Sequence, residues 1–227
     1  MSLSERLGDA RERIANAASA AKRNPEDIKL IVVTKNHPAQ LVLDLLELGV
    51  RDFGENRDQE AAPKSAEVRA ASNIEHHWHF IGQLQSNKVK SVVSYASSIH
   101  SLDRQSLLDA LGKATNERQV PLDVFIQLNL TDDPARGGIQ DANLLAFAEN
   151  VLTHPGLNLI GVMGVASLDN QLERDFGLIR EASQKLQTLK PSANLISAGM
   201  SEDFETAIAF GATHLRIGSA ITGKRQY

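Results

Sequence analysis

The chain has 227 residues, of which 42% are hydrophobic and 23% charged, and these values predict one soluble globular domain covering residues 1–227. Its 24 Lys and Arg against 28 Asp and Glu give a formal charge of −4, which argues against a broad nucleic-acid surface. Cysteine is absent, which excludes disulfides and thiolate chemistry, and no apolar run is long enough for a signal peptide or membrane span, so we expect a cytoplasmic protein.

The first elements lead to a lysine. Apolar residues at helical spacing predict an amphipathic helix at the N-terminus, and Ser2 and Glu5 fit a capping box. After a break at Asn24–Pro25, residues 30–34 read as a strand buried on both faces, which ends on Lys35. Partial desolvation there would lower the pKa of the lysine, and a neutral amine can form a Schiff base with a carbonyl. The alternative is a solvated lysine that closes the strand.

The remaining chain alternates strands and helices. The predicted strands are 30–34, 50–53, 77–81, 98–101, 122–129, 157–165, 195–197 and 214–217. The predicted helices after them are 38–48, 57–70, 87–94, 104–116, 142–152, 173–189, 202–210 and 218–223. Eight short β–α units favour an α/β fold, a single (β/α)8 TIM barrel with an extra N-terminal helix. An open doubly wound sheet is the alternative.

Functional residues of such a barrel follow the carboxyl ends of its strands, at the mouth. The residues expected there are polar or glycine more often than strand interiors: Lys35, Asn56, His79, Gln83, Ser101, Asn129, Met163, Ser197–Ser201 and Arg216–Ser219. The cluster His76–His79 lacks further ligands at metal spacing, so no metal site is expected.

The last two loops favour an anion. Gly199 and Gly218 allow close backbone approach, Ser201 and Ser219 offer hydroxyls, and each loop opens a helix, where phosphate often binds in barrels. The alternative is that the glycines make tight turns and the serines cap helices. Arg216 is expected to point into the same cavity or, alternatively, to form an ion pair at the barrel end with Asp203 or Glu55.

An amine, a phosphate cradle and an arginine in one mouth suggest a phosphorylated aldehyde. Pyridoxal 5′-phosphate (PLP) fits all three groups, whereas a phosphosugar held as a Schiff base, as in class I aldolases, fits two.

Five ordered motifs carry a resemblance over nearly the whole chain. They are VVTK at 32–35, FGEN at 53–56, WHFIGQLQSNK at 78–88, SAGMS at 197–201 and RIGSAITGKR at 216–225. They resemble the PLP homeostasis proteins of the YggS/PROSC type. The resemblance implies one barrel similar to the N-terminal domain of alanine racemase (fold type III), which holds PLP as a Schiff base and acts in the cellular supply of PLP without robust catalysis.

The resemblance also implies roles for single residues. Lys35 matches the Schiff-base lysine, and Arg216 matches the residue that faces the pyridine nitrogen. The other residues expected to bind PLP are Asn56, His79, Ser197, Met200, Ser201, Gly218 and Ser219. The chain departs from the family pattern at Gln83, where many members have proline, at Ala198, where many have methionine, and in the ending GKRQY.

A PLP-dependent amino-acid racemase of the alanine racemase type is the alternative function. Arginine does not readily give up a proton, so Arg216 would leave the pyridine ring a weak electron sink. Alanine racemases also use a tyrosine opposite the lysine and a second domain. This chain has only Tyr95 and Tyr227, neither at a predicted strand end, and stops after the eighth unit. We therefore expect a monomeric, non-catalytic PLP carrier that exchanges PLP with PLP-dependent apoenzymes.

Overall fold

The structure, a computed structural model, describes residues 1–131, 133, 137–167 and 171–223. Eight parallel strands form a closed barrel in which each strand pairs with its neighbours in the chain and β1 pairs with β8. The strands are β1 (Lys29–Val33), β2 (Asp52–Glu55), β3 (His77–Phe80), β4 (Ser98–Leu102), β5 (Leu122–Gln127), β6 (Leu157–Met163), β7 (Leu195–Ser197) and β8 (His214–Ile217). The predicted TIM barrel is confirmed, and the β1–β8 pairing excludes an open sheet.

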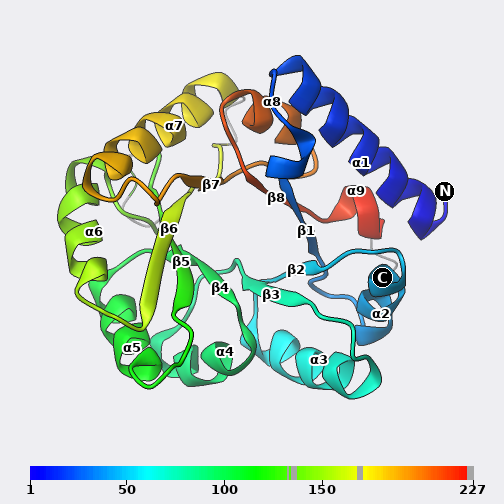
Figure 1. Cartoon of the computed structure of the whole chain (residues 1–227), viewed down its shortest axis with the longest axis horizontal. Helices are drawn as coiled ribbons and strands as arrows, with labels where there is room; N and C mark the ends of the chain where they lie inside the picture. Colours follow the sequence, from blue (N-terminus) through cyan, green and yellow to red (C-terminus); the bar gives the residue numbers. More distant parts are fainter. Residues whose placement is uncertain (132, 134–136, 168–170, 224–227) are drawn as a thin grey trace.

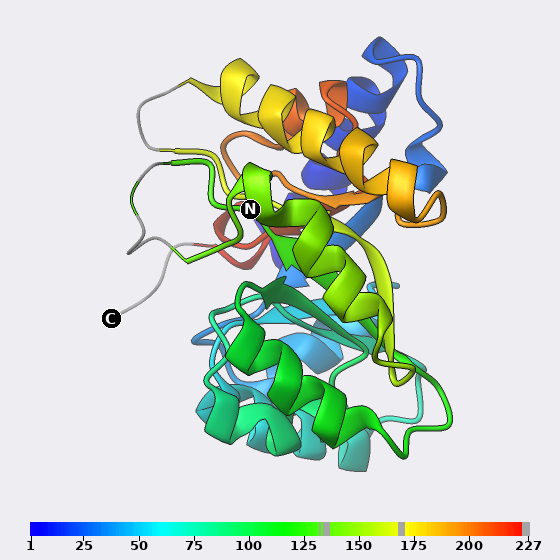
Figure 2. The same cartoon turned by 90° about the vertical axis from the view of Figure 1, so that its left-hand side faces the viewer.

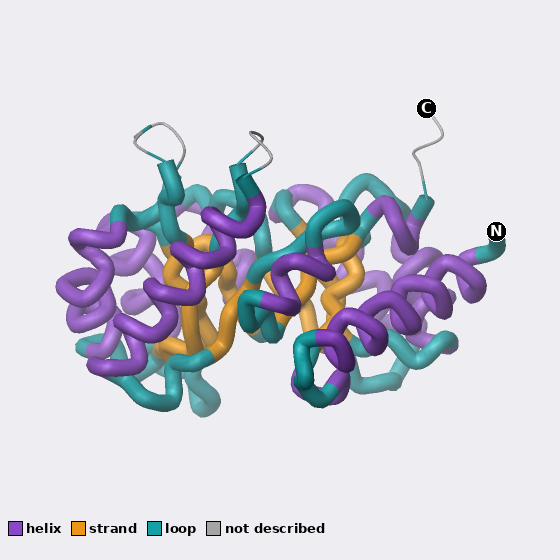
Figure 3. Tube along the Cα trace, turned by 90° about the horizontal axis from the view of Figure 1, so that it is seen from above, coloured by secondary structure: helices purple, strands orange, loops and turns teal. Residues whose placement is uncertain are grey.

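Helices form a ring around the strands (Figures 1 and 3). They are α1 (Leu3–Ala20), α2 (Ala39–Glu47), α3 (Asp58–Ala71), α4 (Val89–Tyr95), α5 (Gln105–Thr115), α6 (Leu144–Leu152), α7 (Leu172–Leu189), α8 (Phe204–Ala209) and α9 (Ser219–Thr222). Short 3-10 turns cover Pro25–Asp27, Ser86–Lys88 and Asp141–Asn143. No helix in the described part of the chain is long and apolar enough to cross a membrane.

The additional helix α1 lies beside α8 and α9, as the view of Figure 1 shows. The Ser2–Glu5 capping box forms as predicted. Arg6 Nε donates to the carbonyl oxygen of Ile221 in α9 at 2.6 Å. The first helix of the chain thus supports the short helix that follows the last strand.

The two faces of the strands differ in chemistry. Outward-facing side chains such as Ile99, Val124 and Val162 are fully buried between the sheet and the surrounding helices. Figure 2 shows these helices from the side of the barrel. A Cβ atom at Gly54 would lie 3.1 Å from Ile31 Cγ2, so both residues face the barrel interior. Register then places polar residues on the same inner face: Arg216 pairs with Ile31, and His79 pairs with Gly54 and Ser98. The interior of this barrel is therefore polar as well as closely packed.

The second strand is displaced from its prediction. The apolar residues indicate a strand at 50–53, but β2 covers Asp52–Glu55 because Gly54 pairs with Val33 and Glu55 pairs with Phe80. The shift carries the glutamate of the FGEN motif into the ladder. It also leaves Asn56 as the first residue beyond the strand.

Candidate functional site

Lys35 lies at the mouth of the barrel, two residues beyond the end of β1. The residue is exposed, and its side chain makes no hydrogen bond or ion pair with any other described residue. The expectation that the strand end desolvates this amine is therefore wrong. The structure instead presents the amine to solvent, on a segment whose backbone is held in place.

The backbone after Lys35 turns sharply. Asn36 has a φ of +61°, the left-handed region that asparagine tolerates better than most residues. The N–H of Asn36 donates to Glu60 Oε2 of α3 at 2.9 Å. This bond ties the turn that carries Lys35 to the helix beside it.

A buried cluster fixes the residue before Lys35. Lys64 Nζ of α3 donates to Glu55 Oε1 at 2.6 Å and to the carbonyl oxygen of Thr34 at 2.9 Å. Thr34 Oγ1 also donates to Glu55 Oε1, at 2.7 Å. Burial raises the pKa of the Glu55 carboxyl, and the hydrogen bonds from Lys64 and Thr34 act against that rise. Two bonds from α3 thus hold the backbone on either side of the lysine.

Replacement of Glu60 by alanine tests this support. We expect Glu60→Ala to lower the free energy of unfolding by about 1 kcal/mol, because it removes the charged carboxylate that accepts a hydrogen bond from the Asn36 N–H. Urea unfolding monitored by circular dichroism measures the change. Glu60→Gln keeps an acceptor oxygen and should recover most of the loss. Equal stability of Glu60→Ala and the unaltered chain would contradict the assignment.

Asn56 follows β2 at the mouth, where its backbone packs against Gly82. A Cβ atom at position 82 would lie 2.2 Å from the Asn56 carbonyl oxygen and 2.7 Å from its Cα, far inside van der Waals contact. The segment after β3 is therefore restricted to glycine at this point. This close contact fixes the position of the Asn56 backbone at the mouth of the barrel.

Gly82→Ala is accordingly expected to destabilise the fold by about 2 kcal/mol, as overpacking against backbone typically does. The control is Gly8→Ala in α1, where an added Cβ meets no atom within 4 Å and helix propensity rises. Chemical denaturation of both variants checks the contrast. Loss of stability in both, or in neither, would show that the contact with Asn56 does not determine the outcome.

The loops after β7 and β8 lie together at the mouth. Ser219 Oγ donates to Ser201 Oγ at 3.3 Å, and the Ala220 N–H donates to the same Ser201 oxygen at 3.3 Å. Gly199 has a φ of +93°, and a Cβ there would lie 2.9 Å from Ala207 Cβ, so only glycine fits between the loop and α8. Met200 of the same loop is exposed. Hydrogen bonds thus join the two loops that the sequence predicts to bind an anion.

Arg216 is buried inside the barrel, below these loops. Its guanidinium donates to Ser197 Oγ at 2.6 Å and to the carbonyl oxygen of Gly164 at 2.9 Å. Of the five N–H donors of a guanidinium, these are the two with acceptors among the described residues. Burial lowers the pKa of Arg216 to about 10, so the group stays charged at neutral pH. Neither Asp203 nor Glu55 forms the ion pair considered as an alternative.

His79 lies deeper than the sequence predicts. The residue is 5% exposed, and its Nε2 atom is 2.8 Å from Oδ1 of Asp52, the first residue of β2. The ring is therefore directed toward the end of the barrel opposite the mouth. Ser101, also expected at the mouth, is fully buried within β4, and its hydroxyl has no hydrogen-bond partner among the described residues.

Sequence reasoning missed the polar residues in the barrel interior. Asp52, Ser98 and His100 alternate with apolar residues along β2 and β4, and a two-residue period was the available signal. His100 is fully buried, with its Nδ1 atom 2.7 Å from Ser197 Oγ. The last residues of the RIGSAITGKR motif, 224 and 225, lie outside the described residues.

The donor set fits a phosphorylated heterocyclic aldehyde. An exposed amine and two serine hydroxyls stand at one mouth, and a buried cation with spare donors lies beneath them. The model for the N-terminal domain of alanine racemase matches residues 7–226. The pyridoxal phosphate homeostasis protein of Escherichia coli K12 is 36% identical over 228 residues, 99% of this chain and 97% of that protein. This chain belongs to the pyridoxal phosphate homeostasis proteins.

One further homeostasis protein and two solved structures are also similar to this chain. The homeostasis protein of Mycobacterium tuberculosis H37Rv is 36% identical over 240 residues, 99% of this chain and 93% of that protein. The structure of PipY from Synechococcus elongatus PCC7942, solved with PLP bound, superposes with a TM-score of 0.82 at 32% identity, covering 97% of this chain and 99% of PipY. Alanine racemase from Corynebacterium glutamicum shares the fold, with a TM-score of 0.66 at 14% identity over 60% of that enzyme.

Proposed function

We propose that this chain is a PLP carrier that binds the cofactor covalently through Lys35 and acts in intracellular PLP homeostasis. The observation that carries the proposal is the meeting, at one barrel mouth, of an exposed lysine, the joined Ser201–Ser219 loops and the buried Arg216. The family membership of the chain supports it, as does PipY, which was solved with PLP bound.

Each group has a distinct task in this proposal. The Lys35 amine would hold the cofactor through its aldehyde carbon, whose oxygen would be released as water. The Ser201 and Ser219 hydroxyls and the adjoining backbone bind the phosphate, with Gly218 allowing close approach. Arg216, which uses two of its N–H groups on Ser197 and Gly164, would offer a remaining N–H donor to the pyridine nitrogen. Asn56 and Met200 would contact the cofactor at the mouth, and Ser197 would act through Arg216, from which it accepts a hydrogen bond. His79 is directed toward the opposite end of the barrel and is not assigned to the cofactor.

We propose carriage rather than racemisation. Bound PLP supplies an electron sink, but a guanidinium that stays charged donates a hydrogen bond to the ring nitrogen without protonating it. Tyr95 donates its hydroxyl to Asp58 Oδ1 of α3 at 3.3 Å, and burial raises its pKa, so it is not available as an acid or base at the mouth. Tyr227 lies outside the described residues. An exposed lysine suits exchange of PLP with apoenzymes more than sequestered chemistry.

The proposal also covers the oligomeric state, the cellular compartment and the partners of the protein. A single-domain, monomeric and cytoplasmic protein would meet the PLP-dependent apoenzymes that need the cofactor. Neither a nucleic acid nor a membrane is required as a partner.

Reductive trapping tests the proposed function. The purified protein is incubated with PLP, reduced with borohydride and digested, and we expect the pyridoxyl mass on the peptide that contains Lys35. In parallel, alanine and serine of defined chirality are incubated with the PLP-loaded protein, and their chirality should remain unchanged. Absence of covalent label would contradict the carrier, whereas rapid racemisation would favour the enzyme.

A further inference from the structure

A continuous line of polar side chains crosses the barrel interior beneath the mouth. It begins at Arg216, whose Nη1 donates to Ser197 Oγ, and Ser197 Oγ lies 2.7 Å from His100 Nδ1. His100 Nε2 lies 3.0 Å from His79 Nδ1, and Ser98 Oγ bridges the two rings at 3.1 and 2.7 Å. The line therefore joins β8, β7, β4 and β3 across the core.

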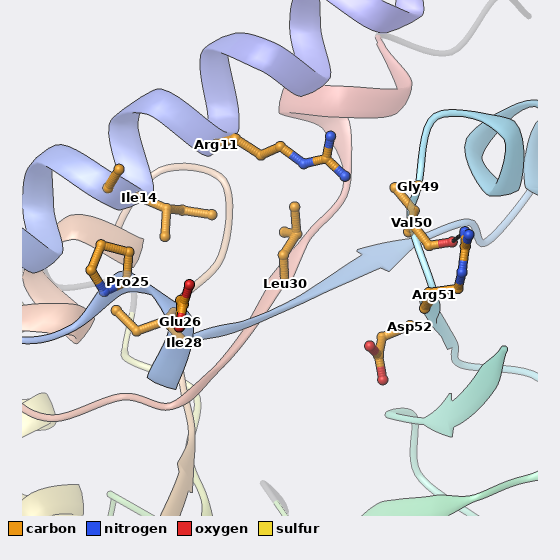
Figure 4. Close-up of a pocket in the computed structure, with 11 residues that line it drawn as sticks. Arg11, Ile14, Pro25, Glu26, Ile28, Leu30, Gly49, Val50, Arg51 and Asp52 are labelled. Carbon is orange, nitrogen blue, oxygen red and sulfur yellow. Dashed lines mark hydrogen bonds between the residues drawn. The ribbon is translucent and has the colours of Figure 1, made fainter. Parts of the chain in front are cut away.

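The far end of this line reaches the opposite end of the barrel. His79 Nε2 is 2.8 Å from Asp52 Oδ1, which also accepts a hydrogen bond from Lys29 Nζ at 3.0 Å. Asp52 lines a cavity of about 430 Å³ together with Arg11 and Arg51 (Figure 4). Lys29 and Asp52 are the first residues of β1 and β2, so the ion pair lies at the end remote from Lys35.

The protonation states determine which atom donates and which accepts in each hydrogen bond along this line of side chains. Burial alone would raise the pKa of Asp52, but hydrogen bonds from His79 and Lys29 and the positive charge of Lys29 lower it to about 2, so this carboxylate only accepts. Burial lowers the pKa of His79 and of His100, so both rings are neutral at pH 7 and each carries one N–H. His79 must place that proton on Nε2, which faces Asp52, and its Nδ1 must accept.

The remaining protons are then determined. His79 Nδ1 accepts from the Ser98 hydroxyl or from His100 Nε2, and in both arrangements His100 carries its proton on Nε2. His100 Nδ1 therefore accepts from the Ser197 hydroxyl, and the lone pairs of Ser197 Oγ are left for Arg216. The reverse direction would leave a buried histidine nitrogen facing a carboxylate or without a donor, which is costly.

We propose that Asp52, His79, Ser98, His100 and Ser197 form a directed hydrogen-bond chain that positions the Arg216 guanidinium toward the cofactor. These five are positioning residues, because they act on the cofactor through Arg216. The inference rests on the proposed function for its effect on PLP, but the direction of the chain is a property of the protein alone. Its anchor is the ion pair of Asp52 with Lys29, at the end of the barrel opposite Lys35.

The first test uses the protein without PLP. Nitrogen-15 NMR at pH 7.5 should show both His79 and His100 as neutral rings protonated on Nε2. Because this measurement needs no substitution, it does not depend on a variant that folds. A proton on Nδ1 of either ring, or an average of the two tautomers, would overturn the proposal.

The second test measures PLP retention by equilibrium dialysis. Ser197→Ala and Asp52→Ala are expected to weaken binding about fivefold to tenfold, the size of one lost hydrogen bond to a charged group, while Asp52→Asn keeps an acceptor and should retain most of the affinity. The control is His214→Gln, since His214 is also buried but its ring hydrogen-bonds Thr213 and none of the five proposed positioning residues. Equal affinity of Ser197→Ala and His214→Gln would overturn the inference. Failure of the unaltered protein to bind PLP would instead contradict the proposed function and leave the NMR result standing.

Discussion

Lys35→Ala is expected to abolish the absorbance band near ~420 nm that a Schiff base between PLP and lysine gives. The variant loses the only amine that, in the proposal, binds the aldehyde group of PLP. Because the Lys35 side chain is exposed and makes no bond to another described residue, the free energy of unfolding should change by less than about 0.5 kcal/mol. Spectra taken after incubation with PLP and desalting, together with urea unfolding, measure both effects.

The matched control for this variant is Lys90→Ala, which removes an exposed lysine from α4 on the helix ring. That variant should keep the band in full. A band that persists in Lys35→Ala, or a pyridoxyl mass on Lys29 or Lys64 of the unaltered protein, would remove Lys35 from its role. Of these two lysines, Lys64 is the stronger alternative, because its amine lies next to the backbone that carries Lys35. That amine already donates hydrogen bonds to Glu55 and Thr34.

The second large effect is acid unfolding. Burial lowers the pKa of His79 and His100, and it lowers the pKa of His214 to about 3, whereas each is near 6.5 in an unfolded chain. Below pH 6.5 the unfolded chain therefore binds protons that the folded chain does not, and stability falls as pH falls. Each histidine contributes about 1.4 kcal/mol per pH unit until its folded pKa is reached, which makes about 4 kcal/mol per pH unit while all three rings are neutral in the folded chain.

Urea unfolding of the protein without PLP, at steps between pH 7.5 and 4.5, measures this slope. A domain of ordinary stability, about 5–15 kcal/mol, should unfold within a few pH units below 6.5. The pKa of Asp52, lowered to about 2, adds a further loss only below about pH 3.8, where the unfolded carboxyl takes up its proton. As the pH falls, the three histidines therefore lower the stability before Asp52 does.

His214→Gln isolates one of the three contributions. The substitution should reduce the slope by about a third, because a glutamine takes up no proton in either state. Gly82→Ala provides the contrast, since overpacking lowers stability by the same amount at every pH and should leave the slope unchanged. Constant stability between pH 7.5 and 5 would contradict the assignment of neutral buried rings.

The sequence was informative wherever local pattern and tertiary environment agree. Strands β7 and β8 have the predicted bounds, 195–197 and 214–217. Gly211 and Gly218 flank β8, and Pro191 and Gly199 flank β7, so the ends of both apolar runs are marked in the sequence. Strand β2 was displaced because its extent depends on pairing with β1 and β3, which a local apolar run at Val50 does not encode.

The candidate site divides in the same way. Lys35, Arg216 and the loops at Ser201 and Ser219 were found because the last residues of barrel strands meet at one mouth. The hydrogen-bonded side chains inside the barrel, such as His100, were not predicted. Barrel interiors are usually apolar, so the polar residues considered were assigned to the mouth instead. The exposure of Lys35 depends on where the chain turns after β1, and the left-handed Asn36 determines that turn.

The pairing of β1 with β8 has a consequence for biosynthesis. Lys35 and Arg216 are distant in the chain, yet Ile31 and Arg216 are register partners across the seam of the barrel. A nascent chain still lacking its final strand at the ribosome has an amine but no guanidinium beneath it and no Ser219 beside Ser201. PLP binding is therefore expected only after β8 and the Ser219 loop have been synthesised, so the cofactor would not guide the earlier stages of folding.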